Sequence, residues 1–230
     1  AAERSMQHDS ERPDCSLVIP YGLGYAHAQV LPSSPENPFL RIAVPVAEGE
    51  SLTIATNLVG SYNADNVMAA IAVGCHFGVS FDEAVGAIEA YVPSNNRSQM
   101  TRTSRNTLIV DAYNANPTSM EAALGNFATV ESDQKIAALG DMLELGDESL
   151  AEHVRIAAMA LDLGLQRVCF VGTEFAKALA TFEDLPADKV ISFDTSAELA
   201  DWFTANPCQG SVILIKGSRG TRMEKVIAVL

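Results

Sequence analysis

The chain has 230 residues, of which 48% are hydrophobic and 19% are charged, a composition typical of a folded globular protein. Its formal net charge is −14, from 29 acidic and 15 basic residues, which argues against a nucleic-acid-binding protein because the chain repels polyanions on average. Its apolar runs fall short of the roughly 20 residues that a membrane helix needs, and its four cysteines form no CxxC pair, which favours a reducing cytoplasm.

The first 14 residues are polar and mixed in charge. They contain no apolar stretch of the kind found in a signal peptide, so we expect no cleaved leader there. The segment also lacks the pattern of a natural domain start. The simplest interpretation is a cut, or an internal boundary, within a longer protein.

The next part of the chain consists of short β-prone runs separated by prolines, which predicts small antiparallel strands joined by turns. These runs cover residues 17–19, 25–31, 39–44 and 52–56. Two helices are predicted after them, over residues 64–77 and 81–91. Ser80 and Glu83 predict a capping box at the start of the second helix. Residues 93–96 (PSNN) form a predicted linker.

From about Gln99 onward, apolar β-prone runs alternate with helical patterns. The predicted strands are 107–110, 135–139, 167–171, 189–192 and 212–215, and the predicted helices are 118–130, 149–163, 173–181, 196–205 and 218–229. Near-continuous apolar strands joined by helices indicate a parallel sheet covered on both faces. The predicted fold class is therefore α/β: a Rossmann-like domain with a mostly parallel sheet, over residues 95–230, after a smaller part over residues 1–94.

Polar side chains follow the predicted strands, at the edge where open α/β sheets bind ligands. Carboxylates, amides and two positive charges are therefore expected to converge there. They are Asp111, Tyr113, Asn114, Asn116, Asp141, Asp194, Lys216, Ser218 and Arg219.

Each of these residues also has a purely structural interpretation. Asn114 and Asn116 can form Asx turns and cap the helix that begins near Pro117. Asp141 can be a loop residue without a ligand, and the 216–219 run can supply only surface charges and a helix cap. A Lys-Gly-Ser-Arg turn at a strand end also suits a carboxylate or a phosphate. His153 lies in a predicted helix and is interpreted as a packed or solvated histidine rather than a catalytic base.

The common nucleotide and hydrolase motifs are absent from the sequence. No G-x-x-x-x-G-K-[ST] loop is present, so no P-loop cradle can form from these residues. No G-x-G-x-x-G run opens a βα unit, which removes the main support for a dinucleotide-dependent dehydrogenase.

Several motifs, in order along the chain, resemble those of the Mur ligases. They are 111–120 (DAYNANPTSM), 139–146 (LGDMLELG) followed by His153, and 216–219 (KGSR). Upstream, 57–66 (NLVGSYNADN) resembles the family's G-x-H-N-x-x-N segment, and Arg97 matches an arginine that follows it. The resemblance covers nearly the whole chain from about Ile19, and several ordered motifs are far more specific than one.

The resemblance implies an ATP-dependent ligase of three domains, of which this chain carries two parts. Residues 1–94 resemble the end of the central ATP-binding domain without its P-loop, and residues 95–230 the whole carboxy-terminal domain. The implied reaction activates the carboxylate of a UDP-MurNAc-tripeptide as an acyl phosphate, which the amine of D-Ala-D-Ala then attacks. ATP and Mg²⁺ serve the full-length enzyme, whereas this fragment, without the P-loop, magnesium ligands and modified lysine, is expected to be inactive and to hold no cofactor tightly.

Site residues are carried over only at positions that match the motifs. The resemblance places Asn63 and Asn66 near adenine, and Arg97 and Asp111 near phosphate and ribose hydroxyls. It places Tyr113, Asn114, Asn116, Lys216, Ser218 and Arg219 on the side of the dipeptide and the reacting centre. Tyr62 departs from the family pattern, which has histidine at that position; a tyrosine could still stack on a base.

Two alternatives remain from the sequence. One is a free-standing Rossmann-like module that binds a small anionic ligand or a partner protein. The other is a ligase of the same family with a different amino-acid substrate, against which the 113–116 run (YNAN) favours D-Ala-D-Ala.

Overall fold

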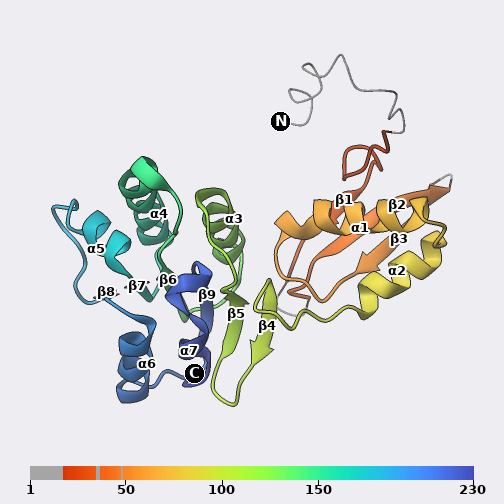
Figure 1. Ribbon diagram of the computed structural model, residues 1–230. Helices are drawn as coiled ribbons and strands as arrows, with labels where there is room; N and C mark the ends of the chain where they lie inside the picture. Colours follow the sequence, from red (N-terminus) through yellow and green to blue (C-terminus); the bar gives the residue numbers. More distant parts are fainter. Residues whose placement is uncertain (1–17, 35–36, 48) are drawn as a thin grey trace.

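The structure is a computed structural model that describes residues 18–34, 37–47 and 49–230 (Figure 1). The interpretation of residues 1–14 falls outside the described residues. So does residue 17 of the predicted strand over 17–19, and its other two residues, Val18 and Ile19, lie in no strand. The described chain forms two sheets, each with its own helices.

The first sheet is antiparallel, as predicted, and it has three strands where four β-prone runs were predicted. β1 (Gln29–Leu31), β2 (Arg41–Ala47) and β3 (Glu50–Ala55) pair in the order β1-β2-β3. A 3₁₀ turn, η2 (Ser61–Asn63), leads into α1 (Ala64–His76), which is followed by α2 (Phe81–Ala90). Ile42 and Ile54 of the sheet are fully buried and pack with Val67 and Ile71 of α1 in one hydrophobic core.

The start of α2 confirms the predicted capping box. The Ser80 hydroxyl accepts a hydrogen bond from the Glu83 backbone N–H at 3.3 Å, and the Glu83 carboxylate accepts one from the Ser80 backbone N–H at 3.1 Å. Two of the helix's otherwise unsatisfied donors are thereby paired.

The second sheet has six strands in the order β4-β5-β9-β6-β7-β8. They are β4 (Gln99–Arg102), β5 (Thr107–Asp111), β6 (Lys135–Gly140), β7 (Arg167–Val171), β8 (Val190–Phe193) and β9 (Val212–Lys216). All neighbours are parallel except β4, which pairs antiparallel with β5 at the edge. β4 was not predicted, because its sequence QMTR has only one strongly apolar residue and half-exposed edge strands leave a weak pattern.

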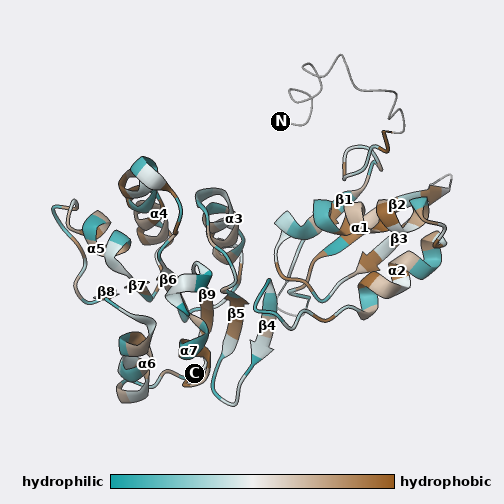
Figure 2. Cartoon of the chain, viewed as in Figure 1, coloured by the Kyte–Doolittle hydropathy of each residue, from teal (hydrophilic) through white to brown (hydrophobic). Residues whose placement is uncertain are grey.

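Helices cover both faces of this sheet, as expected for the α/β class (Figure 1). α3 (Pro117–Ala128), α4 (Ser149–Asp162) and α5 (Thr173–Leu179) pack on one face, and α6 (Ser196–Ala205) and α7 (Glu224–Ile227) on the other. β5 is hydrophobic along its length (Figure 2) because alternate residues meet the two cores: Ile109 faces α3 to α5, and Leu108 and Val110 face α6 and α7. No described helix is both long and apolar enough to cross a membrane.

The predicted helix over 218–229 is wrong in its first half. The chain forms a 3₁₀ turn, η4 (Arg219–Thr221), then adopts a left-handed conformation at Arg222 (φ 52°) before the short α7. Contacts of Ser218 with the loop after β6 decide this course, since its backbone N–H donates to the Asp141 carbonyl at 3.1 Å. The approach is close, because a Cβ on Gly217 would lie 3.0 Å from the Cα of Gly140.

The linker between the two sheets is fixed by hydrogen bonds to both sides. The Asn96 carbonyl accepts from the Ala112 backbone N–H at 2.8 Å, at the end of β5. The Ser98 carbonyl accepts from the Val59 backbone N–H at 3.0 Å, on the side of the first sheet. Asn96 and Ser98 both have positive φ (57° and 47°), so the backbone turns sharply on either side of Arg97.

Candidate functional site

The carboxyl ends of the parallel strands meet at one edge of the six-stranded sheet. Strand register pairs Asp111 of β5 with Lys216 of β9, and Lys216 in turn with Leu139 of β6. β7 and β8 extend the same edge, since Gly140 pairs with Val171 and Val171 with Phe193. The predicted convergence is therefore confirmed, because each strand end delivers its following loop to this edge.

Asp111 and Lys216 form an ion pair at the centre of the edge. The Lys216 ammonium lies 2.5 Å from Oδ2 of Asp111 and donates to the Asn114 carbonyl at 3.3 Å. The lysine side chain is 1% exposed and the aspartate side chain 14%. Two of the three ammonium donors are thus used by protein groups, and Lys216 links the end of β9 to Asp111 and to the loop that carries Asn114.

Two guanidinium groups lie near the ring of Tyr113 at the same edge. Its ring is 37% exposed and lies 3.8 Å, centroid to Cζ, from Arg97 of the linker. The Cζ of Arg219, from the loop after β9, lies 5.5 Å from the same centroid. Both distances allow a cation–π interaction. Three residues expected at the site from three separate segments thus come together.

Asn63 and its neighbours form a polar cluster beside Asp111. The Asn63 side-chain amide donates to the Val59 carbonyl at 3.0 Å and to the Ser98 hydroxyl at 2.9 Å. Asn66 donates to Oδ1 of Asn63 at 3.4 Å. Asn63 is buried and its N–H groups are used, so in this structure it ties η2 to the linker, whereas Asn66 is exposed and open to a ligand.

Tyr62 joins the same cluster from the side of the first sheet. Its hydroxyl lies 3.2 Å from that of Ser98. Burial, reinforced by the negative charge of Asp111 and partly offset by the hydrogen bond with Ser98, raises the pKa of Tyr62 to about 12. The side chain therefore stays neutral in all ordinary conditions and brings a hydroxyl, not a charge, toward Asp111.

Asn116 fulfils the structural interpretation as a helix cap, whereas among the described residues the Asn114 side chain forms a hydrogen bond only with the residue next to it. Oδ1 of Asn116 accepts from the Ser119 backbone N–H at 2.8 Å and caps α3, with Pro117 as its first residue. Oδ1 of Asn114 accepts from the next backbone N–H, that of Ala115, at 2.9 Å. Both side chains remain exposed, but one oxygen of each is already used by the backbone.

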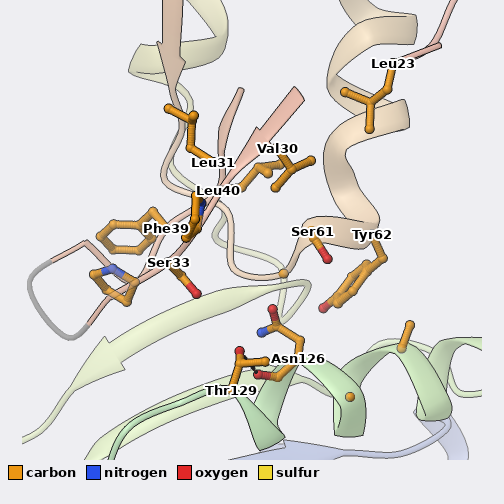
Figure 3. Close-up of a pocket in the computed structure, with 15 residues that line it drawn as sticks. Leu23, Val30, Leu31, Ser33, Phe39, Leu40, Ser61, Tyr62, Asn126 and Thr129 are labelled. Atoms are coloured by element: carbon orange, nitrogen blue, oxygen red, sulfur yellow. Dashed lines mark hydrogen bonds between the residues drawn. The ribbon is translucent and has the colours of Figure 1, made fainter. Parts of the chain in front are cut away.

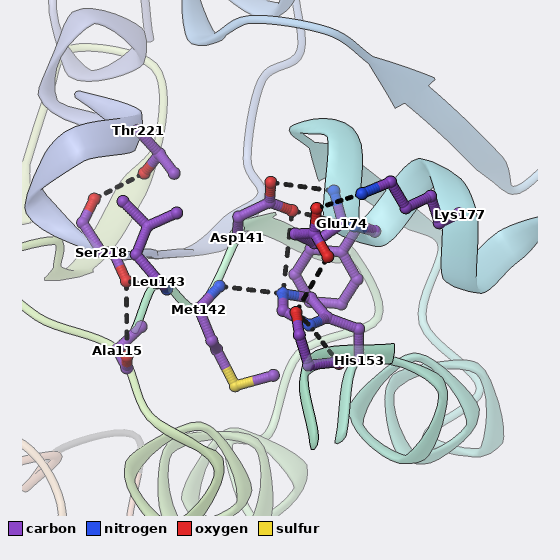
Figure 4. Close-up of polar contacts among 11 residues, drawn as sticks. Ala115, Asp141, Met142, Leu143, His153, Glu174, Lys177, Ser218 and Thr221 are labelled. Carbon is purple, nitrogen blue, oxygen red and sulfur yellow. Dashed lines mark hydrogen bonds and ion pairs between the residues drawn. The ribbon is translucent and has the colours of Figure 1, made fainter. Parts of the chain in front are cut away.

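Ser218 is buried, and it ties β9 to the loops after β5 and β6 (Figure 4). Its hydroxyl donates to the Ala115 carbonyl at 3.3 Å and accepts from the Leu143 backbone N–H at 2.9 Å. Ser218 therefore supports the edge from a buried position, whereas Arg219, the next residue, is exposed.

Asp141 and His153 are structural residues. Asp141 is buried and its carboxylate accepts from the backbone N–H groups of Glu174 (3.0 Å) and Phe175 (2.9 Å), so it caps α5 from another strand (Figure 4). His153 is fully buried; its Nε2 accepts from the Met142 backbone N–H at 3.0 Å, which leaves Nδ1 to donate to the Ser149 carbonyl at 2.7 Å. The interpretation of His153 as a packed residue is confirmed.

Two concave regions lie beside the six-stranded sheet and its helices. A crevice of about 330 Å³ lies over the ends of β6, β7 and β8, and Asp194, Arg222 and Lys225 line it. The sequence did not indicate the two cations as site residues, because they fell inside the predicted helix over 218–229. A larger pocket of about 740 Å³ lies between the first sheet and α3 (Figure 3). Leu31, Leu40 and Tyr62 line it from one side, and Asn126 and Thr129 from the other.

The residues present suit an anion better than a metal ion. Within residues 18–34, 37–47 and 49–230, no three His, Cys, Asp or Glu side chains lie close enough together to hold a metal ion. The guanidiniums of Arg97 and Arg219 and the second oxygen of Asp111 suit phosphate oxygens, a carboxylate and hydroxyl groups.

The fold defines an α/β protein of the doubly wound class, with a candidate ligand site at the carboxyl edge of its parallel sheet. A family model described as "Mur ligase, glutamate ligase domain" matches residues 96–219, which is more than half of the chain. The chain therefore belongs to the Mur ligase family, and the resemblance drawn from its motifs is confirmed.

Individual relatives agree with this assignment. The Bacillus subtilis protein named UDP-N-acetylmuramoyl-tripeptide–D-alanyl-D-alanine ligase is 33% identical over 186 residues, which cover 78% of this chain and 40% of that protein. Its Escherichia coli namesake is 32% identical over 184 residues, covering 78% and 39%. A crystal structure of MurF from Acinetobacter baumannii matches with a TM-score of 0.71 and 29% identity, over 87% of this chain and 43% of that one. The chain thus spans about 40% of the length of the curated relatives it matches.

Proposed function

We propose that this chain is the part of an ATP-dependent, cytoplasmic ligase that receives the nucleotide and the incoming amine when D-Ala-D-Ala is joined to UDP-MurNAc-tripeptide. The observation that carries the proposal is the grouping of Asp111, Arg97 and Arg219 at one edge of a sheet whose sequence relatives bear that enzyme's name. The domain division follows the same reasoning: residues 1–94 complete the ATP-binding domain and residues 95–230 form the carboxy-terminal domain.

The proposed reaction has two displacement steps. A carboxylate oxygen of the tripeptide attacks the γ-phosphorus of ATP, which forms an acyl phosphate and releases ADP. The amine of D-Ala-D-Ala then attacks the acyl carbon, the C–O bond to phosphate breaks, and the amine gives up a proton as the amide forms. This chain contributes binding and charge neutralisation to both steps, and positioning of this kind supplies most of the catalysis in phosphoryl transfer.

The proposed roles follow from the groups that remain open. The free oxygen of Asp111, held at the end of β5 by Lys216, accepts ribose hydroxyls. Arg97 faces phosphate oxygens, Arg219 faces the terminal carboxylate of the dipeptide, and Asn66 faces the adenine. Asn63, Asn114, Asn116, Lys216 and Ser218 support these groups through the contacts described above. ATP and the two peptide substrates belong to the whole enzyme; the P-loop needed for turnover is not in this sequence.

A chimeric enzyme tests the proposal. The corresponding carboxy-terminal part of the Bacillus subtilis ligase is replaced by residues 19–230 of this chain, and ADP release is measured with the tripeptide substrate and D-Ala-D-Ala. Activity that depends on D-Ala-D-Ala is expected. Arg219→Ala should raise the KM for the dipeptide by about tenfold, the loss typical of one charged hydrogen-bonding partner, and Asp111→Asn should raise the KM for ATP instead.

The same assay decides between the alternatives. ADP release that depends on a single amino acid rather than on the dipeptide would identify a family member with a different substrate. A folded chimera that is inactive with every acceptor, with Arg219→Ala unchanged in ligand binding, would contradict the ligase and favour a free-standing binding module.

A further inference from the structure

The arrangement of Arg97, Tyr113 and Arg219 has a consequence for how the site holds negative charge. The three residues come from the linker, the end of β5 and the end of β9. Hydrogen bonding of Ala112 to Asn96 lays the linker beside the end of β5, which brings Arg97 to 3.8 Å from the Tyr113 ring. The pairing of Asp111 with Lys216 lays the end of β9 on the other side, which brings Arg219 to 5.5 Å.

Both guanidiniums keep their charge available. Among the described residues, neither Arg97 nor Arg219 forms an ion pair with a carboxylate, and both side chains are exposed. The Asp111 carboxylate, which lies on the same edge, is already paired with Lys216. Two uncompensated positive charges therefore remain at one place on a chain whose net charge is −14.

The ring explains how these two like charges stay together. Two guanidiniums repel each other, and long arginine side chains lose conformational freedom when they are held in one place. The negative face of an aromatic ring attracts a guanidinium by about 0.5–1 kcal/mol at an exposed site. The backbone of Arg97 is fixed on both sides by the turns at Asn96 and Ser98, so the ring has only to direct the side chain.

We propose that Tyr113 is a positioning residue that holds Arg97 and Arg219 together as one two-guanidinium site for an oxyanion. The bound group is a phosphate or a carboxylate, which a guanidinium binds through paired N–H donors. The inference rests on the proposed function for the source of that oxyanion. It is either the phosphate chain of the nucleotide, with Arg219 joining Arg97, or the carboxylate of the dipeptide, with Arg97 joining Arg219. Tyr113 itself acts through the two arginines and does not need its hydroxyl.

The test titrates two anions into the 230-residue chain by calorimetry. Inorganic triphosphate represents the phosphate chain and D-Ala-D-Ala represents the carboxylate. The variants are Tyr113→Phe, which keeps the ring, Tyr113→Leu, which removes it, and Tyr91→Leu. Tyr91 is an exposed tyrosine at the carboxyl end of α2 and has no cation–π partner among the described residues. Circular dichroism and thermal unfolding confirm that each variant is folded.

We expect Tyr113→Leu to weaken binding of at least one anion by about 5- to 30-fold, the loss of two cation–π contacts. Tyr113→Phe and Tyr91→Leu should bind as the unchanged chain does. In a chain that already carries Arg97→Ala, Tyr113→Leu should weaken anion binding by a smaller factor than it does in the unchanged chain. The two substitutions remove the same interaction, so their effects are not additive. Whichever anion responds identifies the source of the oxyanion.

A second readout does not depend on any ligand. The Nε–H signals of Arg97 and Arg219 should carry ring-current shifts in NMR spectra of the unchanged chain and of Tyr113→Phe, and lose them in Tyr113→Leu. Equal binding by the unchanged chain and Tyr113→Leu would overturn the proposal. So would equal losses in Tyr113→Phe and Tyr113→Leu, because they would point to the hydroxyl, and so would the absence of binding of either anion to the unchanged chain. None of these results affects the ligase proposal, which the chimera tests separately.

Discussion

At the scale of single residues, the ion pair between Asp111 and Lys216 neutralises two of the charges at the site. Both side chains are largely withdrawn from water, and the ion pair joins two strands whose residues are 105 positions apart in the chain. Withdrawing charges from water costs free energy, so each of these charges is destabilising unless its partner is present. The ion pair therefore contributes to the placement of Asp111 more than to net stability.

Removing one partner of this ion pair should destabilise the folded chain. We expect Lys216→Met to lower the free energy of unfolding by about 3 kcal/mol, because it leaves the Asp111 carboxylate partly buried without a counter-charge. The measurement is urea unfolding followed by circular dichroism. Arg155→Gln is the matched control, since its ion pairs with Glu121 and Glu152 are exposed and should contribute less than about 1 kcal/mol. A double variant, Asp111→Asn with Lys216→Met, should be more stable than Lys216→Met alone; if it is less stable, the explanation is wrong.

Tyr62 gives the site a measurable dependence on alkaline pH. Burial, and then the charge of Asp111, raises its pKa from 10.0 to about 12, so the folded chain keeps this proton where the unfolded chain has lost it. The stability that the shift represents is complete below pH 10 and is lost as the pH rises from about 10 to about 12.

An ultraviolet titration of tyrosinate absorbance checks this prediction. Of the five tyrosines, one should ionise near pH 12, and that step should be missing in Tyr62→Phe. Tyr21→Phe, which changes an exposed tyrosine, serves as the control and should leave the late step intact. A late step that persists in Tyr62→Phe would assign the raised pKa to another tyrosine.

At the scale of secondary-structure elements, side chains in the loops after the strands cap helices and so organise the edge. Asn116 caps its own helix, α3, through the Ser119 backbone N–H. Asp141, at the end of β6, caps α5, and Gly172 leaves room for it, because a Cβ there would lie 2.2 Å from the Asp141 carboxylate. The loops around the site are thus held by hydrogen bonds to helix N-termini: Asn116 binds the helix that follows it in the chain, and Asp141 binds the helix of the next βα unit.

The cap of α3 can be separated from any role in substrate binding. Asn116→Ala should lower the free energy of unfolding by about 1 kcal/mol, whereas Asn116→Asp, which also caps, should be nearly neutral. Thermal unfolding of the two variants is the measurement, with Ser80→Ala in α2 as a control of the same kind. If Asn116→Ala is as stable as the unchanged chain but binds D-Ala-D-Ala less well, the side chain serves the ligand and not the helix.

At the scale of the whole molecule, the two sheets have cores of different extent. The three-stranded sheet and its helices bury one cluster, whereas the six-stranded sheet is packed on both faces by two larger ones. Exposed apolar side chains are numerous in the first part, with Phe77 at 81% and Val73 at 57%. Less apolar surface is therefore withdrawn from water there, and its stabilisation is smaller.

We predict that the three-stranded sheet opens more readily than the six-stranded one. Amide hydrogen exchange should show lower protection in β2, β3 and α1 than in β5, β6 and β9. Exchange is read residue by residue by NMR at neutral pH, in the absence of ligand. Equal protection of the two sheets would contradict the prediction and would mean that they unfold as one cooperative unit.

Much of the fold follows from local patterns. The capping box of α2, the βα alternation and the boundaries of α4 and α6 were predicted within a few residues, because periodicity and capping act over short stretches. β4 and the start of the last helix were not. An edge strand of mixed polarity carries little signal, and the turn at Arg219 to Arg222 depends on hydrogen bonds from Ser218 to residues distant in the sequence.

By itself the sequence determined the α/β class, the order of the motifs and therefore the family, because these reside in residue types and their local spacing. Only the tertiary structure decided that Lys216 is buried against Asp111, that Asp141 caps a helix, and that Arg97 and Arg219 meet on the ring of Tyr113. The physical reason is that strand register and the course of the linker join residues far apart in the chain, and these long-range contacts settle whether a charge is neutralised inside the protein or left open to a ligand.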